Sequence, residues 1–200
     1  MIGVISLFAL ASAAGADDFD RAWAEAEEVS RLEAFLDETV GDCEKVPNKD
    51  GARRACEREA QSVRRERSGK VFAVRFDDLA SRLSDFGFDR KKKQYRVLLT
   101  PVFGAGGLGL TLGAPLRLDG AGHPIVRRLP VWLTKPSDVP EPFFRRDVER
   151  GLLRMELLFE VERAWRMQRA GHVVRGLSVR LRGLRLRTRS DVIAETLSPP

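Results

Sequence analysis

The spacing of apolar residues changes along the chain and divides it into regions. From residue 17 to residue 68 they recur every three or four positions, as on the buried side of amphipathic helices. The first such stripe consists of Phe19, Trp23, Ala26, Val29, Leu32, Leu36 and Val40. A polar turn over 47–51 separates it from a second helix over 52–67, which has few apolar residues to hold it in place. The sequence therefore predicts an N-terminal helical hairpin over residues 17–68.

After residue 69 apolar and polar residues alternate, which is typical of strands. Extended segments are expected over 70–76, 94–103, 108–112 and 125–133. Pro130 cannot donate a ladder hydrogen bond, so the last of these strands is expected to bend or to lie at a sheet edge. Short helices are expected over 79–86 and 143–150.

Residues 151–187 carry the clearest alternation in the chain. Apolar residues occupy every second position from Leu153 to Val161, with mostly charged residues between them, and the pattern returns from Leu177 onward with one slip at Gly183. A slip at a glycine is typical of a β-bulge. This region is therefore expected to form a long antiparallel hairpin with one solvated face.

Charge suggests the register of that hairpin. A three-residue loop with Gly171 in the left-handed conformation would place Arg169 opposite Val173. Opposite charges facing each other across the strands would then favour this register over its neighbours. The expected pairs are Glu162 with Arg180, Glu160 with Arg182, and Glu156 with Arg187.

The two cysteines, Cys43 and Cys56, lie at the end of the first predicted helix and in the first turns of the second. A close pair in an exported protein usually forms a disulfide, and closing a loop this short stabilises by about 3 kcal/mol. A metal site would need further soft ligands, and the chain offers only His123 and His172, both distant in sequence. A structural disulfide is expected, and no metal site.

Together these elements predict an α+β fold. A disulfide-linked helical hairpin over residues 17–68 packs on a twisted antiparallel β-sheet of about five to seven strands, built by residues 69–200. The two parts are expected to form one domain, because about 184 residues suffice for one core. The sheet either curls into a partial barrel or is covered on one face by the first helix.

The N-terminus resembles a signal peptide over residues 1–16. An uncharged apolar run is followed by small residues in two Ala-x-Ala patterns, although the usual Lys or Arg before the run is missing. The run is too short to span a membrane, so no transmembrane span is expected in the mature chain. These features predict a periplasmic or secreted protein, and the bias for Arg over Lys is typical of a GC-rich bacterial genome.

No motif in the sequence meets the requirements for catalysis or for cofactor binding. The run from Gly104 to Gly109 matches Gly-x-Gly-x-x-Gly, but no helix opens there and no acidic residue follows at the required distance, so a glycine-rich hairpin or a bulged strand is expected instead. His123 and His172 lie in predicted turns, and the glutamates of the hairpin have Arg partners, which lower a carboxyl pKa rather than raise it. No catalytic residue and no cofactor is assigned.

The distribution of charge is asymmetric. Residues 17–44 hold eleven acidic and two basic side chains, whereas residues 169–189 hold seven Arg and no acid. Such an Arg-rich strand is a candidate anion-binding surface. Its candidate residues are Arg180, Arg182, Arg185, Arg187 and Arg189. Nucleic acid is not expected as the partner, because interleaved aromatic residues for base stacking are missing. The alternative is that the acidic helices cover the Arg face.

These observations favour an exported, non-enzymatic protein of the bacterial envelope or a secreted one, which binds a partner protein or an amphipathic lipid through its sheet. An interior for a lipid would be formed by Phe72, Val74, Phe76, Leu157, Phe159, Val161, Leu177, Val179 and Leu181. The alternatives are polyanion binding through the Arg-rich hairpin and an enzyme with no readable motif. The sequence does not name the partner.

Overall fold

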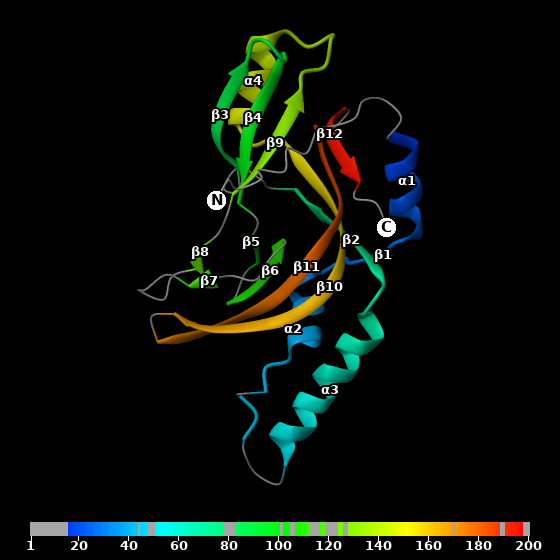
Figure 1. Ribbon diagram of the computed structural model, residues 1–200, viewed down its shortest axis with the longest axis vertical. Helices are drawn as coiled ribbons and strands as arrows, with labels where there is room; N and C mark the ends of the chain where they lie inside the picture. The colour runs from blue at the N-terminus through cyan, green and yellow to red at the C-terminus, as the bar shows by residue number, and fades with distance from the viewer. Residues whose placement is uncertain are drawn as a thin grey trace, which may run out of the picture.

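The computed structural model has an α+β fold (Figure 1), as the sequence predicts. It describes residues 16–43, 45–47, 51–77, 83–100, 102–104, 107–112, 117–118, 124–125, 128–169, 171–188 and 191–197. The predicted signal peptide lies outside the described residues, except for Ala16, where the first helix begins. Among the described helices, none is long and apolar enough to cross a membrane.

The first apolar stripe forms two helices instead of the single helix that the sequence predicts. Helix α1 (Ala16–Glu25) and helix α2 (Leu32–Val40) are separated by the short strand β1 (Glu27–Glu28). The break lets the two halves of the stripe pack on opposite faces of one sheet, with Phe19 of α1 on one face and Leu36 of α2 on the other. Helix α3 (Ala52–Arg67) follows as predicted.

The large sheet is mixed, whereas a wholly antiparallel sheet is expected from the sequence. Its strands are β2 (Val71–Phe76), β5 (Val102–Phe103), β6 (Leu108–Leu112), β10 (Arg154–Arg169), β11 (His172–Arg187) and β12 (Val192–Leu197), with β1 at one edge. The order is β1-β2-β10-β11-β6-β5, and β12 also pairs with β11. The β1–β2 and β6–β11 pairs are parallel. Within the described residues β1 and β5 do not pair with each other, so the sheet stays open and helices cover it.

A smaller antiparallel sheet lies at one end of the long axis of the molecule, and α3 lies at the other (Figure 1). It contains β3 (Leu83–Asp89), β4 (Gln94–Leu99) and β9 (Leu129–Thr134), with α4 (Glu141–Glu149) beside it. A separate two-stranded ribbon joins β7 (Arg117–Leu118) to β8 (Pro124–Ile125). The helix expected over 79–86 is wrong for 83–86, which belong to β3, and 78–82 lie outside the described residues. Pro130 lies in the edge strand β9, as expected.

The long hairpin β10–β11 has a different register from the predicted one. Arg169 lies opposite His172 instead of Val173, because the loop holds two residues, and Gly171 has the expected positive φ of 80°. An irregularity does occur at Gly183, and a second lies between Val161 and Arg163. The predicted ion pairs still form, at 3.3 Å for Glu162–Arg180, 3.3 Å for Glu160–Arg182 and 3.5 Å for Glu156–Arg187. Long side chains reach partners diagonally across the strands, so these ion pairs form even though the register differs from the predicted one.

Both faces of the hairpin are covered near β2, whereas one face is expected to be solvated. On one face a large core cluster joins Phe35 and Leu36 of α2 to Leu157 and Phe159 of β10. On the opposite face Phe19 of α1 packs with Ala73 and Leu158, and all three are buried. A sheet covered on both faces has little solvated strand surface, so its remaining functional surfaces are edges and ends.

Candidate functional site

The candidate anion-binding arginines already have acidic partners wherever the structure describes them. Arg180 is the most exposed of them, with 61% of its side chain accessible, and it contacts Glu160 and Glu162. Arg182 contacts Glu160, and Arg187 contacts Glu156. Arg189 lies outside the described residues. The arginines that the hypothesis needs for a ligand are thus engaged within the protein, and anion binding stays a prediction.

Arg185 shows how the acidic N-terminal region meets the basic strand. It is 4% exposed, and its guanidinium donates to Asp20 of α1 at 2.6 Å and to Glu195 of β12 at 2.8 Å. Burial disfavours its charge, but these hydrogen bonds outweigh burial and hold the pKa of Arg185 above its ordinary value. The alternative in which an acidic helix covers the Arg face is therefore correct at this position.

Arg175 makes a similar contact on the opposite face of β11. Its guanidinium donates to the Asp37 carboxylate at 2.7 Å and pairs with Asp42. Burial raises the pKa of Asp42. A hydrogen bond from Lys45 and the charge of Arg175 lower this pKa by more than burial raises it, so the net shift is downward. The charge asymmetry of the sequence is thus largely an internal contact between acidic helices and basic strands.

The proposed lipid interior is filled by the protein itself. Its residues belong to the core cluster or pack against it, and α2 contributes Phe35, Leu36 and Val40 to the same cluster. The rings of Phe72 and Phe159 both contact the ring of Phe35, at centroid distances of 4.9 and 5.9 Å. These side chains act as core, so the sheet face offers no support for lipid carriage.

Strands β5 and β6, joined through the glycine-rich run, pair as a β-hairpin, as expected, and residues 105 and 106 of the run lie outside the described residues. Val102 pairs with Thr111 across β5 and β6, and Gly104, with φ 158°, begins the turn. A side chain on Gly109 would come within 3.2 Å of the Trp165 indole, so this glycine lets the ring lie against β6. His172 is exposed at the hairpin tip, His123 lies outside the described residues, and no cluster of metal-ligating side chains occurs in the described part of the chain.

One surface of the sheet is left unpaired. Strand β2 pairs with β10 only from Met155 to Glu160, whereas β10 continues to Arg169. Beyond Glu160 the outer edge of β10 has no strand partner among the described residues. An unpaired edge presents backbone donors and acceptors at a regular spacing, so it can accept another strand.

The ladder shows which residues present their backbone groups at this edge. Arg166 lies opposite Arg175, and the N–H of Arg175 donates to the Gly107 carbonyl at 3.0 Å, away from β10. Arg166 and Arg175 are therefore a non-hydrogen-bonded pair, and the backbone N–H of Arg166 also points away from β11. By alternation, Ala164 and Gln168 share this orientation, so their N–H groups lie at the open edge.

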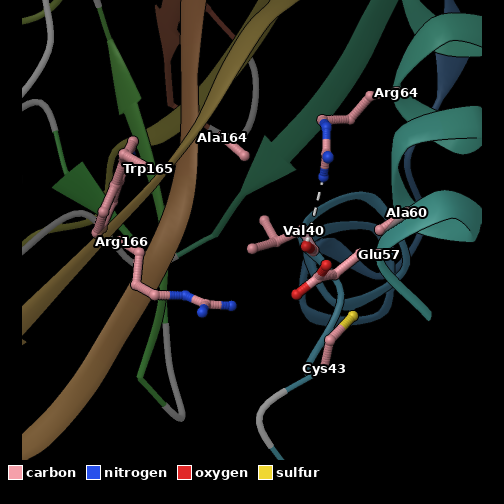
Figure 2. A pocket seen from close by; sticks show the side chains of 8 residues that line it. All are labelled: Val40, Cys43, Glu57, Ala60, Arg64, Ala164, Trp165 and Arg166. Atoms are coloured by element: carbon pink, nitrogen blue, oxygen red, sulfur yellow. Dashed lines mark hydrogen bonds between the residues drawn. The ribbon is translucent and has the colours of Figure 1, made fainter. Parts of the chain in front are cut away.

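A cleft of about 230 Å³ lies beside this edge, between β10 and the two helices α2 and α3. Figure 2 shows α3 facing the hairpin across the cleft, with the side chains of Arg166 and Glu57 directed toward the space between them. Val40 and Ala60 form an apolar floor, and the Trp165 ring turns away toward β6, where its indole N–H donates to Thr111 at 2.9 Å. The cleft thus joins a strand edge to a small apolar surface with charged rims.

The far wall of the cleft is held by few contacts. Ala60 is the one buried residue of α3. The Cys43–Cys56 disulfide forms as predicted and joins α3 to the segment after α2. The guanidinium of Arg64 donates to the carbonyl of Thr39 at 2.8 Å, and Arg67 donates to that of Phe35 at 3.0 Å. The bond to Thr39 satisfies a carbonyl of the last turn of α2, which lacks a helical partner, and the bond from Arg67 adds a second contact to the same helix.

A protein-family model matches residues 1–192. The chain belongs to the family of unknown function DUF6066. The match includes every element up to β11, so the unpaired edge and its cleft lie within the part of the DUF6066 chain that the family model describes. No curated protein and no solved structure matches the chain.

Sequence reasoning did not find the open edge in this DUF6066 protein. One signal was available: the alternation of β10 continues to Glu162 and breaks at Arg163, and the residues from Arg163 to Arg166 no longer follow the core pattern. The predicted strand over 70–76 is also much shorter than β10. A short strand beside a long one leaves an overhang, but the pairing of these two strands could not be known from the sequence.

Proposed function

We propose that this protein is exported and acts outside the cytoplasm as a non-enzymatic binding protein, which holds an extended segment of a partner protein along the outer edge of β10. The observation that carries the proposal is the outer edge of β10 from Val161 to Arg169, beside the cleft, which pairs with no other strand among the described residues. Strand addition to an open edge gives affinity through main-chain hydrogen bonds and specificity through alternate side chains.

The geometry favours an extended peptide over a small molecule. Ala164, Arg166 and Gln168 present backbone groups in a row, which matches the repeat of a second strand. Side chains of that strand would point alternately into the cleft and away from it. The floor formed by Val40 and Ala60 accepts a small apolar side chain, and Glu57 at the rim accepts a basic one.

Export is supported by the disulfide and by the signal-like N-terminus. Cys43 and Cys56 are bridged, and disulfides persist in oxidising compartments such as the bacterial periplasm. Expression of the full chain in a Gram-negative host, followed by fractionation and N-terminal sequencing, tests this part. We expect a chain that begins near Asp17 in the periplasm or medium, and an unprocessed cytoplasmic chain would overturn it.

The partner site can be tested without knowing the partner. A photo-crosslinking amino acid is placed at Gln168, which is exposed at the edge, in the organism that makes the protein. Arg166→Pro then removes an outward N–H without removing a β10–β11 hydrogen bond, and Arg166→Ala keeps that N–H. We expect Arg166→Pro to reduce the cross-link to a second protein about tenfold or more, since proline also blocks the approach of a strand. The matched Arg166→Ala variant should retain most of it.

The outcomes separate the alternatives. Equal yields in the two variants would mean that side chains, and not strand pairing, make the contact. A cross-link to a second copy of this chain would assign the edge to self-association instead of a partner. Cross-linking of the same protein from Arg150, an exposed position beside α4, would show contact without site specificity. The unfolding midpoint of Arg166→Pro should stay close to that of Arg166→Ala.

A further inference from the structure

The turn between β3 and β4 carries the densest group of unpaired positive charge in the described part of the chain. Arg90, Lys91, Lys92 and Lys93 follow one another, and all four are exposed. Three of the seven lysines of the protein lie here. None of the four forms an ion pair within 4.0 Å in the described structure, in contrast to the arginines of β11, which contact carboxylates.

The nearest acid stabilises the turn itself. The Asp89 carboxylate accepts hydrogen bonds from the backbone N–H groups of Lys91 at 2.9 Å and Lys92 at 3.1 Å. Lys93 adopts a positive φ of 53° and returns the chain to Gln94, which pairs with Asp89. This is the side-chain-capped turn that Asp commonly forms. The backbone is therefore fixed, and the four basic side chains extend from a defined tip.

Aromatic side chains flank the same tip. The Lys92 ammonium lies 4.2 Å from the centroid of the Trp132 ring, on the neighbouring strand β9. Phe88, one residue before Asp89, is 40% exposed, although its ring also contacts Tyr95. Figure 1 shows the β3–β4 turn at the extreme end of the long axis, away from α3. A projecting end with cations and partly exposed aromatic rings fits a flat, negatively charged and partly apolar surface.

We propose that this basic tip, defined as residues 88–93 with Trp132, binds the surface of an anionic phospholipid bilayer. Lysine-rich clusters are attracted to anionic leaflets, and Trp prefers the level of the lipid headgroups. A nucleic acid is a poorer fit, because Lys92 covers the Trp132 face that a base would stack on. This inference goes beyond the proposed function and uses residues distant from the β10 edge.

Vesicle binding tests the proposal. The mature protein is mixed at 0.1 M salt with vesicles of phosphatidylcholine alone, or of phosphatidylcholine with one third phosphatidylglycerol, and bound protein is measured by flotation. We expect binding to the anionic vesicles only. Each lysine near an anionic surface contributes roughly fivefold in affinity, so the variant Lys91→Gln/Lys92→Gln/Lys93→Gln should bind at least tenfold more weakly.

A matched control separates the tip from net charge. Arg54→Gln/Arg58→Gln/Arg65→Gln removes the same charge from exposed positions of α3, at the other end of the molecule, and should weaken binding less than threefold. Equal losses in both triple variants would overturn the proposal, as would equal binding to neutral vesicles or no vesicle binding at all. Loss of DNA or heparin binding in the tip variant, without vesicle binding, would assign the tip to another polyanion.

Fluorescence gives a second readout. Trp132 emission should shift to shorter wavelength when anionic vesicles are added, and Trp132→Phe should abolish the shift while Trp23 and Trp165 remain. A shift that persists in Trp132→Phe would contradict the placement of the tip at the bilayer. None of these results depends on the β10 edge, so failure here would leave the strand-addition proposal intact.

Discussion

The guanidinium carbon of Arg185 lies 4.1 Å from the centroid of the Phe19 ring. The ring belongs to the first helix and the guanidinium to the penultimate strand, and both side chains are buried. A cation over an aromatic face is stabilising when it is desolvated, and Asp20, Glu156 and Glu195 neutralise the same guanidinium. This contact fixes α1 on the face of the sheet that the sequence alone marks as solvated.

Removing this guanidinium should strongly destabilise the fold. Arg185→Met leaves three carboxylates without their shared partner, and breaking a buried ion network costs about 3 to 5 kcal/mol. Urea unfolding followed by circular dichroism measures the change. The control is Arg180→Met, an exposed pair, for which we expect less than about 1 kcal/mol. Similar losses for both variants would mean that Arg185 is not the centre of the network.

Loss of the disulfide should release α3 more than the sheet. Cys43→Ala/Cys56→Ala should lower the free energy of unfolding by about 2 to 4 kcal/mol, because the bridge restricts the unfolded chain. Since Ala60 is the one buried residue of α3, hydrogen exchange should accelerate there before it does so in β10 and β11. Uniform acceleration across all three elements would show instead that α3 and the sheet unfold as one unit.

Gly176 should not tolerate a side chain. A Cβ atom at this position would lie 2.0 Å from the Gly109 carbonyl oxygen and 2.4 Å from the Trp165 ring. Gly176→Ala should therefore lower stability by about 2 kcal/mol or more, since backbone and ring must both move. Gly87→Ala is the matched control in a strand of the smaller sheet, where no atom lies within 4 Å. Thermal unfolding of the two variants gives the comparison.

Tyr95 should ionise only in strongly alkaline solution. It is the one tyrosine of the chain, so absorbance of phenolate reports on it alone. Burial raises its pKa well above the ordinary value of 10, and its hydroxyl donates to the Glu141 carboxylate at 2.5 Å, which raises the pKa further. The corresponding stabilisation is present below pH 10 and is lost as the pH rises above it. Glu141→Gln should bring the ionisation closer to pH 10, and an unchanged titration would contradict the role of Glu141.

The sequence predicts which segments form strands and helices better than it predicts which faces of the sheet the helices cover. Alternation from Leu153 to Val161 identifies β10 because core positions on one face must be apolar. The stripe from Phe19 to Val40 looks like one helix because its spacing is continuous, and only packing on two faces of a sheet explains the break at β1. The disulfide follows from the cysteine spacing and from the helices on either side of it.

The candidate site was less accessible to sequence reasoning. An Arg-rich strand marks positive charge, but the sequence does not show which acids lie opposite, and Asp20 reaches Arg185 across most of the chain length. The open edge of β10 depends on how far β2 extends beside it, which is a property of the pairing. The basic residues from Arg90 to Lys93 are visible in the sequence as a run. The sequence does not show that they form no ion pair in the described structure, whereas the arginines of β11 do.

The pairing of the hairpin has a consequence for how the chain becomes native. Strands β2 and β6 are made early and can pair with β1 and β5, but the other edge of each pairs only with β10 or β11, between Met155 and Val179. Neither can complete its ladder until nearly the whole chain is present, because such distant contacts need the late segment. A chain that passes through a membrane pore from its N-terminus would thus stay incompletely folded until the last strands emerge. If the chain is exported as we propose, the late hairpin would delay completion of the fold until transit is nearly complete.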